Sequence, residues 1–220
     1  MRTTSHDPDL DVLMLRFHLE SGARREGALN LRRRDLEADR ATVWLREKGD
    51  SEREQPVSPT LLALLQRQID ARGGSHLDDQ VFRTRNGTPI TARRYDTIFE
   101  RARPCLPWAY RTPVSAHVLR HTAITAVGRL AGYPVAQAFA GHAPPSVTGR
   151  YLHASLSEIA AAVAILTGQL HPLAPLVKVQ PAAAPCDRIL VGSNQHTPVP
   201  SLFVSKARAE HSTRSSCEVM

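Results

Sequence analysis

Ser115-Ala116-His117-Val118-Leu119-Arg120-His121-Thr122 is the stretch of this 220-residue chain that says most about its fold. The apolar spacing over 116–131 predicts a helix, and Gly132 is placed to end it. His117 and Arg120 stand three positions apart, so both side chains project from one face of that helix. A pair of hydrogen-bond donors on one helix face predicts an anion site, to which other segments would bring further basic groups.

Four further positions carry residue types that suit such a site. Arg24 lies at the start of a second predicted helix, Lys48 lies at the tip of a predicted hairpin, and His142 follows a glycine, with Tyr151 nine residues later. Lys48 is the only lysine in the first 177 residues, which contain 22 arginines. Arginine stays protonated in proteins, whereas lysine can also give up a proton. Lys48 is therefore a candidate proton donor as well as a cation.

These six residues together indicate one kind of reaction. Two arginines, two histidines and a lysine suit a phosphate, and they suit the extra charge of a phosphoryl-transfer transition state better. The hydroxyl of Tyr151 is able to attack phosphorus and form a covalent phosphotyrosine. Lys48 is able to protonate the leaving sugar hydroxyl. Because the cations supply the charge that a metal would supply, we expect no metal and no cofactor.

These motifs make the chain similar to the catalytic domain of the tyrosine recombinase (phage integrase) family over residues 7–174. The segment 21–31 resembles the family's first arginine motif, and Lys48 resembles its hairpin lysine. The segment 117–122 resembles its His-x-x-Arg-His-Thr motif, and 141–151 resembles its Gly-His followed nine residues later by tyrosine. The acidic residue after Arg25 is one position earlier than is common in the family.

The resemblance implies an enzyme that cleaves and rejoins DNA at specific sites through a 3′-phosphotyrosine, without metal or ATP. The implied catalytic residues are Arg24, Lys48, His117, Arg120, His142 and Tyr151. Tyr151 would be the nucleophile, Lys48 would protonate the 5′-hydroxyl, and His117 would assist proton transfer near the tyrosine. The remaining three would bind the non-bridging phosphate oxygens. The family acts as a tetramer on two DNA sites, so we expect a homo-oligomer in which the predicted helix 156–166 docks on a neighbour.

The fold expected from the sequence is α+β and mainly α, with the catalytic-domain fold of this family and a small antiparallel sheet. A hairpin is predicted from strands at 42–45 and 54–57, and a further short strand at 81–82. Helices are predicted at 8–21, 23–31, 59–72, 92–103, 116–131, 134–139 and 156–166.

The bulk composition favours a nucleic-acid partner. The net charge is +7 and the isoelectric point is about 9.9, which suits double-stranded DNA or another polyanion. Five arginines are candidates for contacts with the DNA backbone: Arg32, Arg33, Arg34, Arg93 and Arg94. The sequence has no apolar run long enough to span a membrane and no signal peptide, and its three cysteines are scattered. We therefore expect a cytoplasmic, nucleoid-associated protein that does not bind membranes.

We expect two regions along the chain. Residues 1–174 form the predicted catalytic domain, and 175–220, rich in proline, serine and alanine, form a predicted flexible tail. The family usually has an N-terminal core-binding domain, which we expect to be absent. A remnant that only binds DNA or a full-length partner is therefore the alternative to an active recombinase. A metal-dependent hydrolase that uses His117 and His121 is a third alternative.

Overall fold

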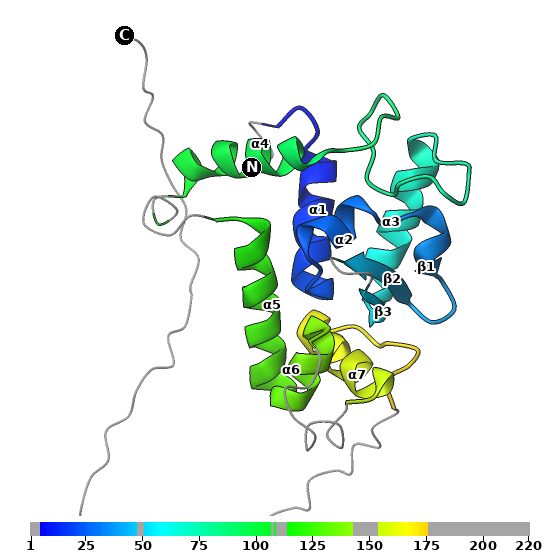
Figure 1. Ribbon diagram of the computed structural model, residues 1–220, viewed down its shortest axis with the longest axis vertical. Helices are drawn as coiled ribbons and strands as arrows, with labels where there is room; N and C mark the ends of the chain where they lie inside the picture. The colour runs from blue at the N-terminus through cyan, green and yellow to red at the C-terminus, as the bar shows by residue number, and fades with distance from the viewer. Residues whose placement is uncertain (1–4, 48–50, 107, 109–113, 143–153, 176–220) are drawn as a thin grey trace, which may run out of the picture. The chain divides into compact units, whose positions relative to one another are not determined.

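The structure is a computed structural model that describes residues 5–47, 51–106, 108, 114–142 and 154–175 (Figure 1). Lys48, Tyr151 and the predicted tail from residue 176 onward lie outside the described residues. The chain divides into two units, Met1–Val177 and Lys178–Met220, and all described residues belong to the first.

The first unit is mainly helical, as the sequence predicts. Its elements, in chain order, are α1 (Pro8–Ser21), α2 (Arg25–Leu29), η1 (Arg33–Asp35), β1 (Leu36–Glu37), β2 (Thr42–Glu47), β3 (Ser51–Pro56), α3 (Pro59–Ala71), α4 (Ala92–Ala102), η2 (Arg103–Cys105), α5 (Ala116–Ala131), α6 (Tyr133–Ala140) and α7 (Leu156–Thr167). None of the helices in the described part is both long and apolar enough to cross a membrane.

The sheet has three antiparallel strands in the order β1-β2-β3. The predicted hairpin is confirmed, with Val43 opposite Gln55 and Leu45 opposite Arg53. The two-residue strand β1 is an addition that the sequence did not signal. The strand predicted at 81–82 is wrong: the described chain there makes only isolated bridges, between Arg32 and Gln80 and between Arg83 and its partner Pro89.

The larger hydrophobic core, here called the N-terminal core, is built by α1, α2, α3, α4 and the sheet. Its largest fully buried side chains include Leu10, Met14, Phe17, Leu65 and Tyr95. The helix predicted at 8–21 is confirmed, and Leu10, Met14 and Phe17 form its buried apolar face. In Figure 1, α1 lies between α3 on one side and α5 on the other.

A second, smaller core joins α5, α6 and α7, and we call it the C-terminal core. Its buried residues are Ala123, Val127, Val135, Ala136, Phe139, Ile159, Ala162 and Val163. A capping box starts α7: Ser155 Oγ accepts from the Glu158 N–H, and the Glu158 carboxylate accepts from the Ser155 N–H. The α7 helix packs within its own chain, against α5, α6 and β3.

Candidate active site

The α5 helix carries an arginine on its buried face. Ala116, Arg120, Ala123 and Val127 are its buried residues, and their spacings of four, three and four are those of one helix stripe. Only 4% of the surface of Arg120 is exposed. A charged group in a stripe that should be apolar needs hydrogen-bond partners to offset its desolvation, so its surroundings are informative.

The guanidinium of Arg120 joins three separate parts of the chain. Its Nη1 donates to the carbonyl oxygen of Gly22, and its Nη2 donates to the carbonyl oxygen of Ala140 at 2.6 Å. The same Nη2 lies 3.3 Å from Nε2 of His142. Because a guanidinium can only donate, Nε2 of His142 is the acceptor, and a neutral imidazole there carries its proton on Nδ1.

The C-terminal end of α6 places His142 beside Arg120. The helix ends at Gly141, which has a φ of +67° in the left-handed region that glycine adopts readily. The amide of His142 then donates to the carbonyl oxygen of Gln137 at 3.1 Å. The Gly-His motif thus works as a helix stop that turns the histidine toward the arginine of α5.

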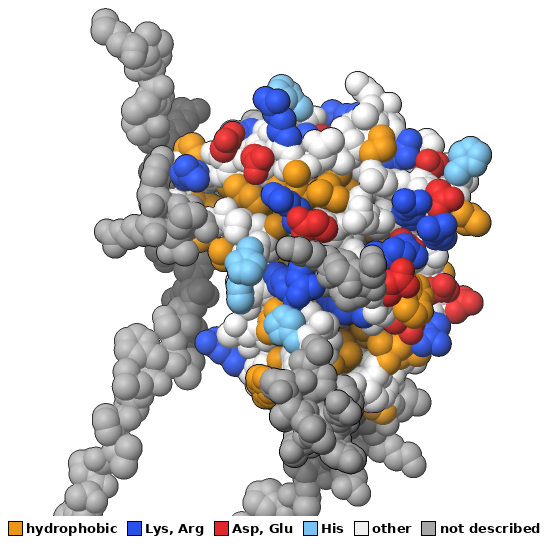
Figure 2. All heavy atoms as spheres, viewed as in Figure 1, with side chains coloured by type: hydrophobic (Ala, Val, Ile, Leu, Met, Phe, Trp, Pro, Cys, Tyr) orange, Lys and Arg blue, Asp and Glu red, His pale blue; other side chains and the backbone are white. Residues whose placement is uncertain are grey.

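A cavity of about 390 Å³ brings four of the six predicted catalytic residues together. Its lining includes Arg24, His117, Arg120 and His142, which come from the N-terminal end of α2, from α5 and from the end of α6. Arginine and histidine side chains gather near the middle of the face shown in Figure 2. The described lining holds more basic than acidic side chains, so the cavity suits an anion.

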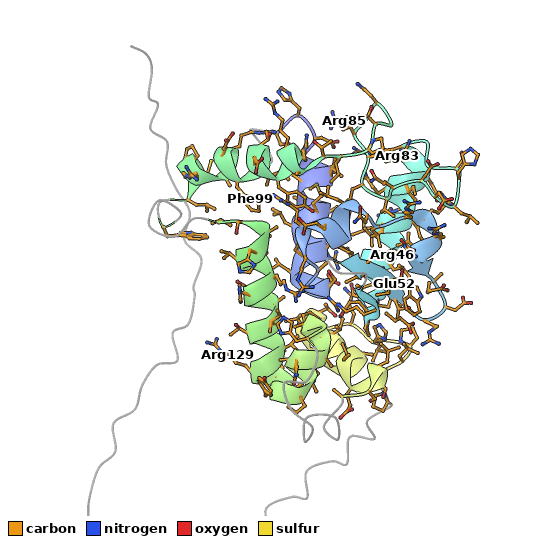
Figure 3. All side chains as sticks on the ribbon, viewed as in Figure 1. Arg46, Glu52, Arg83, Arg85, Phe99 and Arg129 are labelled. Carbon is orange, nitrogen blue, oxygen red and sulfur yellow. The ribbon has the colours of Figure 1, made fainter. Side chains whose placement is uncertain are left out.

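The acidic residue next to the first arginine motif is turned toward solvent. Glu26 forms an ion pair with Arg25 at 3.5 Å, and about half of its side-chain surface is exposed. Figure 3 shows Phe99 projecting from α4 on the side that faces α5, and the same phenyl ring lines the cavity. The rim of the cavity is therefore formed by an exposed ion pair and an aromatic ring.

His117 is paired with His121, one turn further along α5. Their Nε2 atoms are 2.8 Å apart and both side chains are exposed. Among the described residues, no group of three or more His, Cys, Asp or Glu side chains is arranged to hold a metal ion. The described side chains alone therefore do not complete a metal site at this pair.

Tyr95 also lines the cavity, but its hydroxyl is held inside the protein. Nδ1 of His18 donates to the carbonyl oxygen of Ala23 at 3.0 Å, so its Nε2 accepts from the hydroxyl of Tyr95 at 2.8 Å. Burial raises the pKa of Tyr95 well above its ordinary value. A phenol that is buried, bonded and hard to ionise is a poor nucleophile, which disfavours Tyr95 as the attacking group.

The predicted DNA-backbone arginines lie in η1, just before it and on α4, and most of them contact carboxylates. These contacts are Arg32 with Asp78 at 3.0 Å, Arg33 with Asp70 at 2.5 Å, Arg34 with Asp78 at 2.5 Å, and Arg94 with Asp11 at 2.6 Å. Arg93 is exposed in the first turn of α4. Their contact with DNA stays a prediction. In four of the five arginines, a neighbouring aspartate already offsets the positive charge that would face the DNA.

Sequence reasoning missed the backbone and side-chain partners that hold the site together. The carbonyl oxygens of Gly22 and Ala140 give no sequence signal, since every residue has one. Arg53 lies before the strand predicted at 54–57, so the sequence placed it in the turn. The observed β3 begins at Ser51, and its alternation places Arg53 on the same face as Gln55, opposite buried Leu45.

The chain belongs to the phage integrase family, whose family model matches residues 2–158. It is 28% identical over 159 residues to the tyrosine recombinase XerC of Salmonella typhi, covering 68% of this chain and 50% of XerC. It is 29% identical over 160 residues to XerC of Escherichia coli O127:H6, again covering 68% and 50%. The chain therefore spans about half the length of these curated relatives.

Solved structures share the fold. The Tn1549 transposon integrase (residues 82–397) in complex with circular intermediate DNA has a TM-score of 0.51 and 20% identity, covering 74% of this chain and 59% of that chain. The XerH site-specific recombinase bound to difH substrate also has a TM-score of 0.51 and 20% identity, covering 74% and 48%. The expected fold, that of the integrase catalytic domain, is confirmed.

Proposed function

We propose that this protein is a site-specific DNA recombinase that cleaves and rejoins strands through a 3′-phosphotyrosine. The observation that supports the proposal best is the cavity where Arg24, His117, Arg120 and His142 meet. These residues come from segments up to 118 positions apart in the sequence, yet they line one basic hollow. The substrate class is double-stranded DNA in the cytoplasm, and the active species is a homo-oligomer on two DNA sites.

The proposed first step is a transesterification at phosphorus. The hydroxyl oxygen of Tyr151 forms a bond to the phosphorus while the bond from phosphorus to the 5′-oxygen breaks. Lys48 gives its proton to the leaving 5′-oxygen, and the proton of Tyr151 passes to a base near the tyrosine, a role we assign to His117. Because the phosphotyrosine keeps the energy of the ester, a second 5′-hydroxyl reverses the step on a new strand without ATP.

In this scheme the two arginines and His142 bind the non-bridging oxygens. The charge on those oxygens grows as the phosphorus becomes five-coordinate, and donors fixed in place before the reaction stabilise that charge most. Arg120 is fixed by its bonds to Gly22 and Ala140. A buried, bonded guanidinium needs little rearrangement during the step.

A suicide substrate tests the proposal. The protein is incubated, in the presence of EDTA, with a nicked duplex that carries the attachment site from its own genome, and the mixture is then denatured. We expect a covalent protein–DNA adduct that is absent from Tyr151→Phe. Retarded DNA without an adduct would favour the alternative, a binding remnant, and cleavage abolished by EDTA would contradict the recombinase.

The proton donor has its own test. Lys48→Arg keeps the positive charge but holds its proton too tightly to give it away. We expect DNA binding within about twofold of the unaltered protein and adduct formation slower by about 10²-fold or more, the usual contribution of general acid catalysis. An unchanged rate would remove Lys48 from the mechanism.

A further inference from the structure

The inward face of β3 carries two polar side chains where a sheet normally presents apolar ones. Arg53 lies opposite Leu45, and Gln55 lies opposite Val43. Leu45, Val43 and Gln55 are completely buried, and Arg53 is partly buried. Burying these polar groups costs free energy unless they are bonded, so their partners indicate what the strand contacts.

Arg53 connects the sheet to the end of α6. Its Nη1 donates to the carbonyl oxygen of Phe139 at 2.8 Å, across 86 positions of sequence. The same Nη1 donates to Oε1 of Gln55, whose own amide nitrogen donates to the carbonyl oxygen of Pro56 at 3.3 Å. The buried glutamine therefore holds the guanidinium in the direction of the helix.

Two arginines from different elements thus contact the same helix end. Arg53 of β3 binds the carbonyl of Phe139, and Arg120 of α5 binds the next carbonyl, that of Ala140. The last carbonyls of a helix have no partner within it and carry a partial negative charge, so cations there are stabilising. Arg120 also lines the candidate active site, whereas Arg53 reaches the helix from the sheet.

Gly141 is fitted to the side chain of Arg53. A Cβ added to this glycine would lie 2.6 Å from Cδ and 2.7 Å from Nε of Arg53. The arginine stem therefore lies directly against the residue that precedes His142. A displacement of Arg53 should therefore shift the backbone at Gly141 and move His142 with it.

We propose that Arg53 is a positioning residue that fixes the β2–β3 hairpin relative to the helix end that carries His142. The inference rests on the proposed function, because the turn between β2 and β3 carries Lys48 and His142 belongs to the phosphate-binding group. Its consequence, on the proposed function, is that the strands leading into the turn that bears Lys48 keep one geometry relative to His142. Misplacing a reacting group by about 1 Å can slow a reaction by about 10²-fold.

The first test compares two leaving groups. Arg53→Gln removes the contact, and Arg53→Lys keeps the charge but loses the planar fork. Arg40→Gln is the matched control, since Arg40 also binds β3, through Glu54 at 2.9 and 3.0 Å, and its side chain is half exposed. Each protein is given the suicide duplex with an ordinary phosphodiester and with a sulfur in place of the 5′-bridging oxygen, because a thiolate leaves without needing a proton.

We expect both Arg53 variants to form the adduct about 10- to 100-fold more slowly on the ordinary duplex. On the sulfur-containing duplex the part of the deficit that comes from misplacing Lys48 should disappear, and a smaller deficit from the displaced His142 should remain. The Arg40→Gln rate should equal that of the unaltered protein on both. An equal deficit on both duplexes, or no deficit at all, would overturn the positioning role.

Hydrogen exchange gives a readout that does not need activity. The amides of Gly141 and His142 donate to the carbonyl oxygens of Ala138 and Gln137, at 2.9 and 3.1 Å. In Arg53→Gln these two amides and those of the hairpin should exchange faster by about 10-fold, with little change in α1. Unchanged exchange would refute the coupling. If the unaltered protein formed no adduct on either duplex, the proposed function would fail, and the exchange data would still decide whether Arg53 holds the two segments together.

Discussion

The N-terminal core and the C-terminal core of this domain are stabilised in different ways. The first buries large side chains such as Phe17, Phe82 and Tyr95, which pack edge to face or stack with neighbouring rings. The second is built mostly from alanine and valine, and Phe139 is its one large aromatic residue among those described. Small side chains let helices approach closely but remove little apolar surface from water.

Polar contacts from the N-terminal part compensate for that small core. Arg120 and Arg53 bind backbone carbonyls across the boundary, at Gly22 and at Phe139. After α7 the chain returns to the sheet and α3, where Nε2 of His171 donates to the carbonyl oxygen of Ala41 at 3.0 Å. The comparison shows that the helices carrying most of the candidate site depend on bonds to the other part of the domain.

The site itself lies where the two cores meet. Arg24 belongs to the N-terminal part, whereas His117, Arg120 and His142 belong to the C-terminal helices. Any change that loosens the boundary should therefore separate Arg24 from the other residues of the candidate site before it unfolds either core. Four predictions test this dependence.

Phe139→Ala should have the largest effect on stability. The ring is completely buried and lies against Gly22, so its loss should cost roughly 3–5 kcal/mol. The matched variant is Phe17→Ala in the N-terminal core. In hydrogen exchange Phe139→Ala should expose α5, α6 and α7 while α1 and α3 stay protected, whereas Phe17→Ala should weaken all of them. The same exchange pattern in both variants would contradict a C-terminal core that depends on its boundary.

Arg120→Met should cause the second largest loss of stability. It leaves the carbonyl oxygens of Gly22 and Ala140 buried without their donor, at a cost of roughly 2–4 kcal/mol measured by urea unfolding. Arg129→Met is the control, because Arg129 is exposed on the same helix (Figure 3) and should change stability by less than about 0.5 kcal/mol. Similar losses in the two variants would mean that the buried bonds of Arg120 do not stabilise the boundary.

Gly22→Ala should cause a loss of stability smaller than that of Arg120→Met. Gly22 has a φ of +58°, and a Cβ there would lie 2.5 Å from Cε1 of Phe139. Gly168 has a φ of +67° but nothing within 4 Å of such a Cβ, so Gly168→Ala measures the backbone strain alone, about 1 kcal/mol. Thermal melting should show a further loss of about 1 kcal/mol for Gly22→Ala, from overpacking against the ring. Equal melting temperatures would mean that Phe139 moves aside at no cost.

The smallest effect should be a dependence of stability on pH. Burial lowers the pKa of His171 below its ordinary value of 6.5, so the folded state favours the neutral ring. The unfolded chain then binds more protons near and below pH 6.5, and the stabilisation that is complete above that pH is lost as the pH falls toward the folded pKa. The unfolding free energy should therefore fall between pH 7.5 and 5.5, and fall less in His171→Gln. Parallel pH profiles would contradict this origin.

Much of the fold follows from local patterns in the sequence. The hairpin at 42–57 and the helix ends at Gly132, Gly141 and Gly168 depend on residues that are neighbours in the chain. The short strand β1 and the false strand at 81–82 show the limit, because two-residue strands form only where a partner happens to lie beside them.

For the candidate site, too, the sequence predicted some features and left others undecided. The types and order of its residues, from Arg24 to His142, could be predicted because phosphoryl transfer needs donors of particular chemistry at recognisable spacings. The roles of all six residues stay predictions, and Lys48 and Tyr151 also lie outside the described residues. The buried position of Arg120 could also have been predicted, because it falls on the stripe of Ala116, Ala123 and Val127.

The sequence by itself determined the family, most of the secondary structure and the chemical character of the cavity, since these depend on residue types and short-range spacing. Only the tertiary structure decided that Arg120 binds Gly22 across 98 positions and that Arg53 binds Phe139 across 86. Such contacts connect side chains to backbone carbonyls, which every residue has. A guanidinium therefore finds its partner only when packing brings one particular carbonyl within about 3 Å of it.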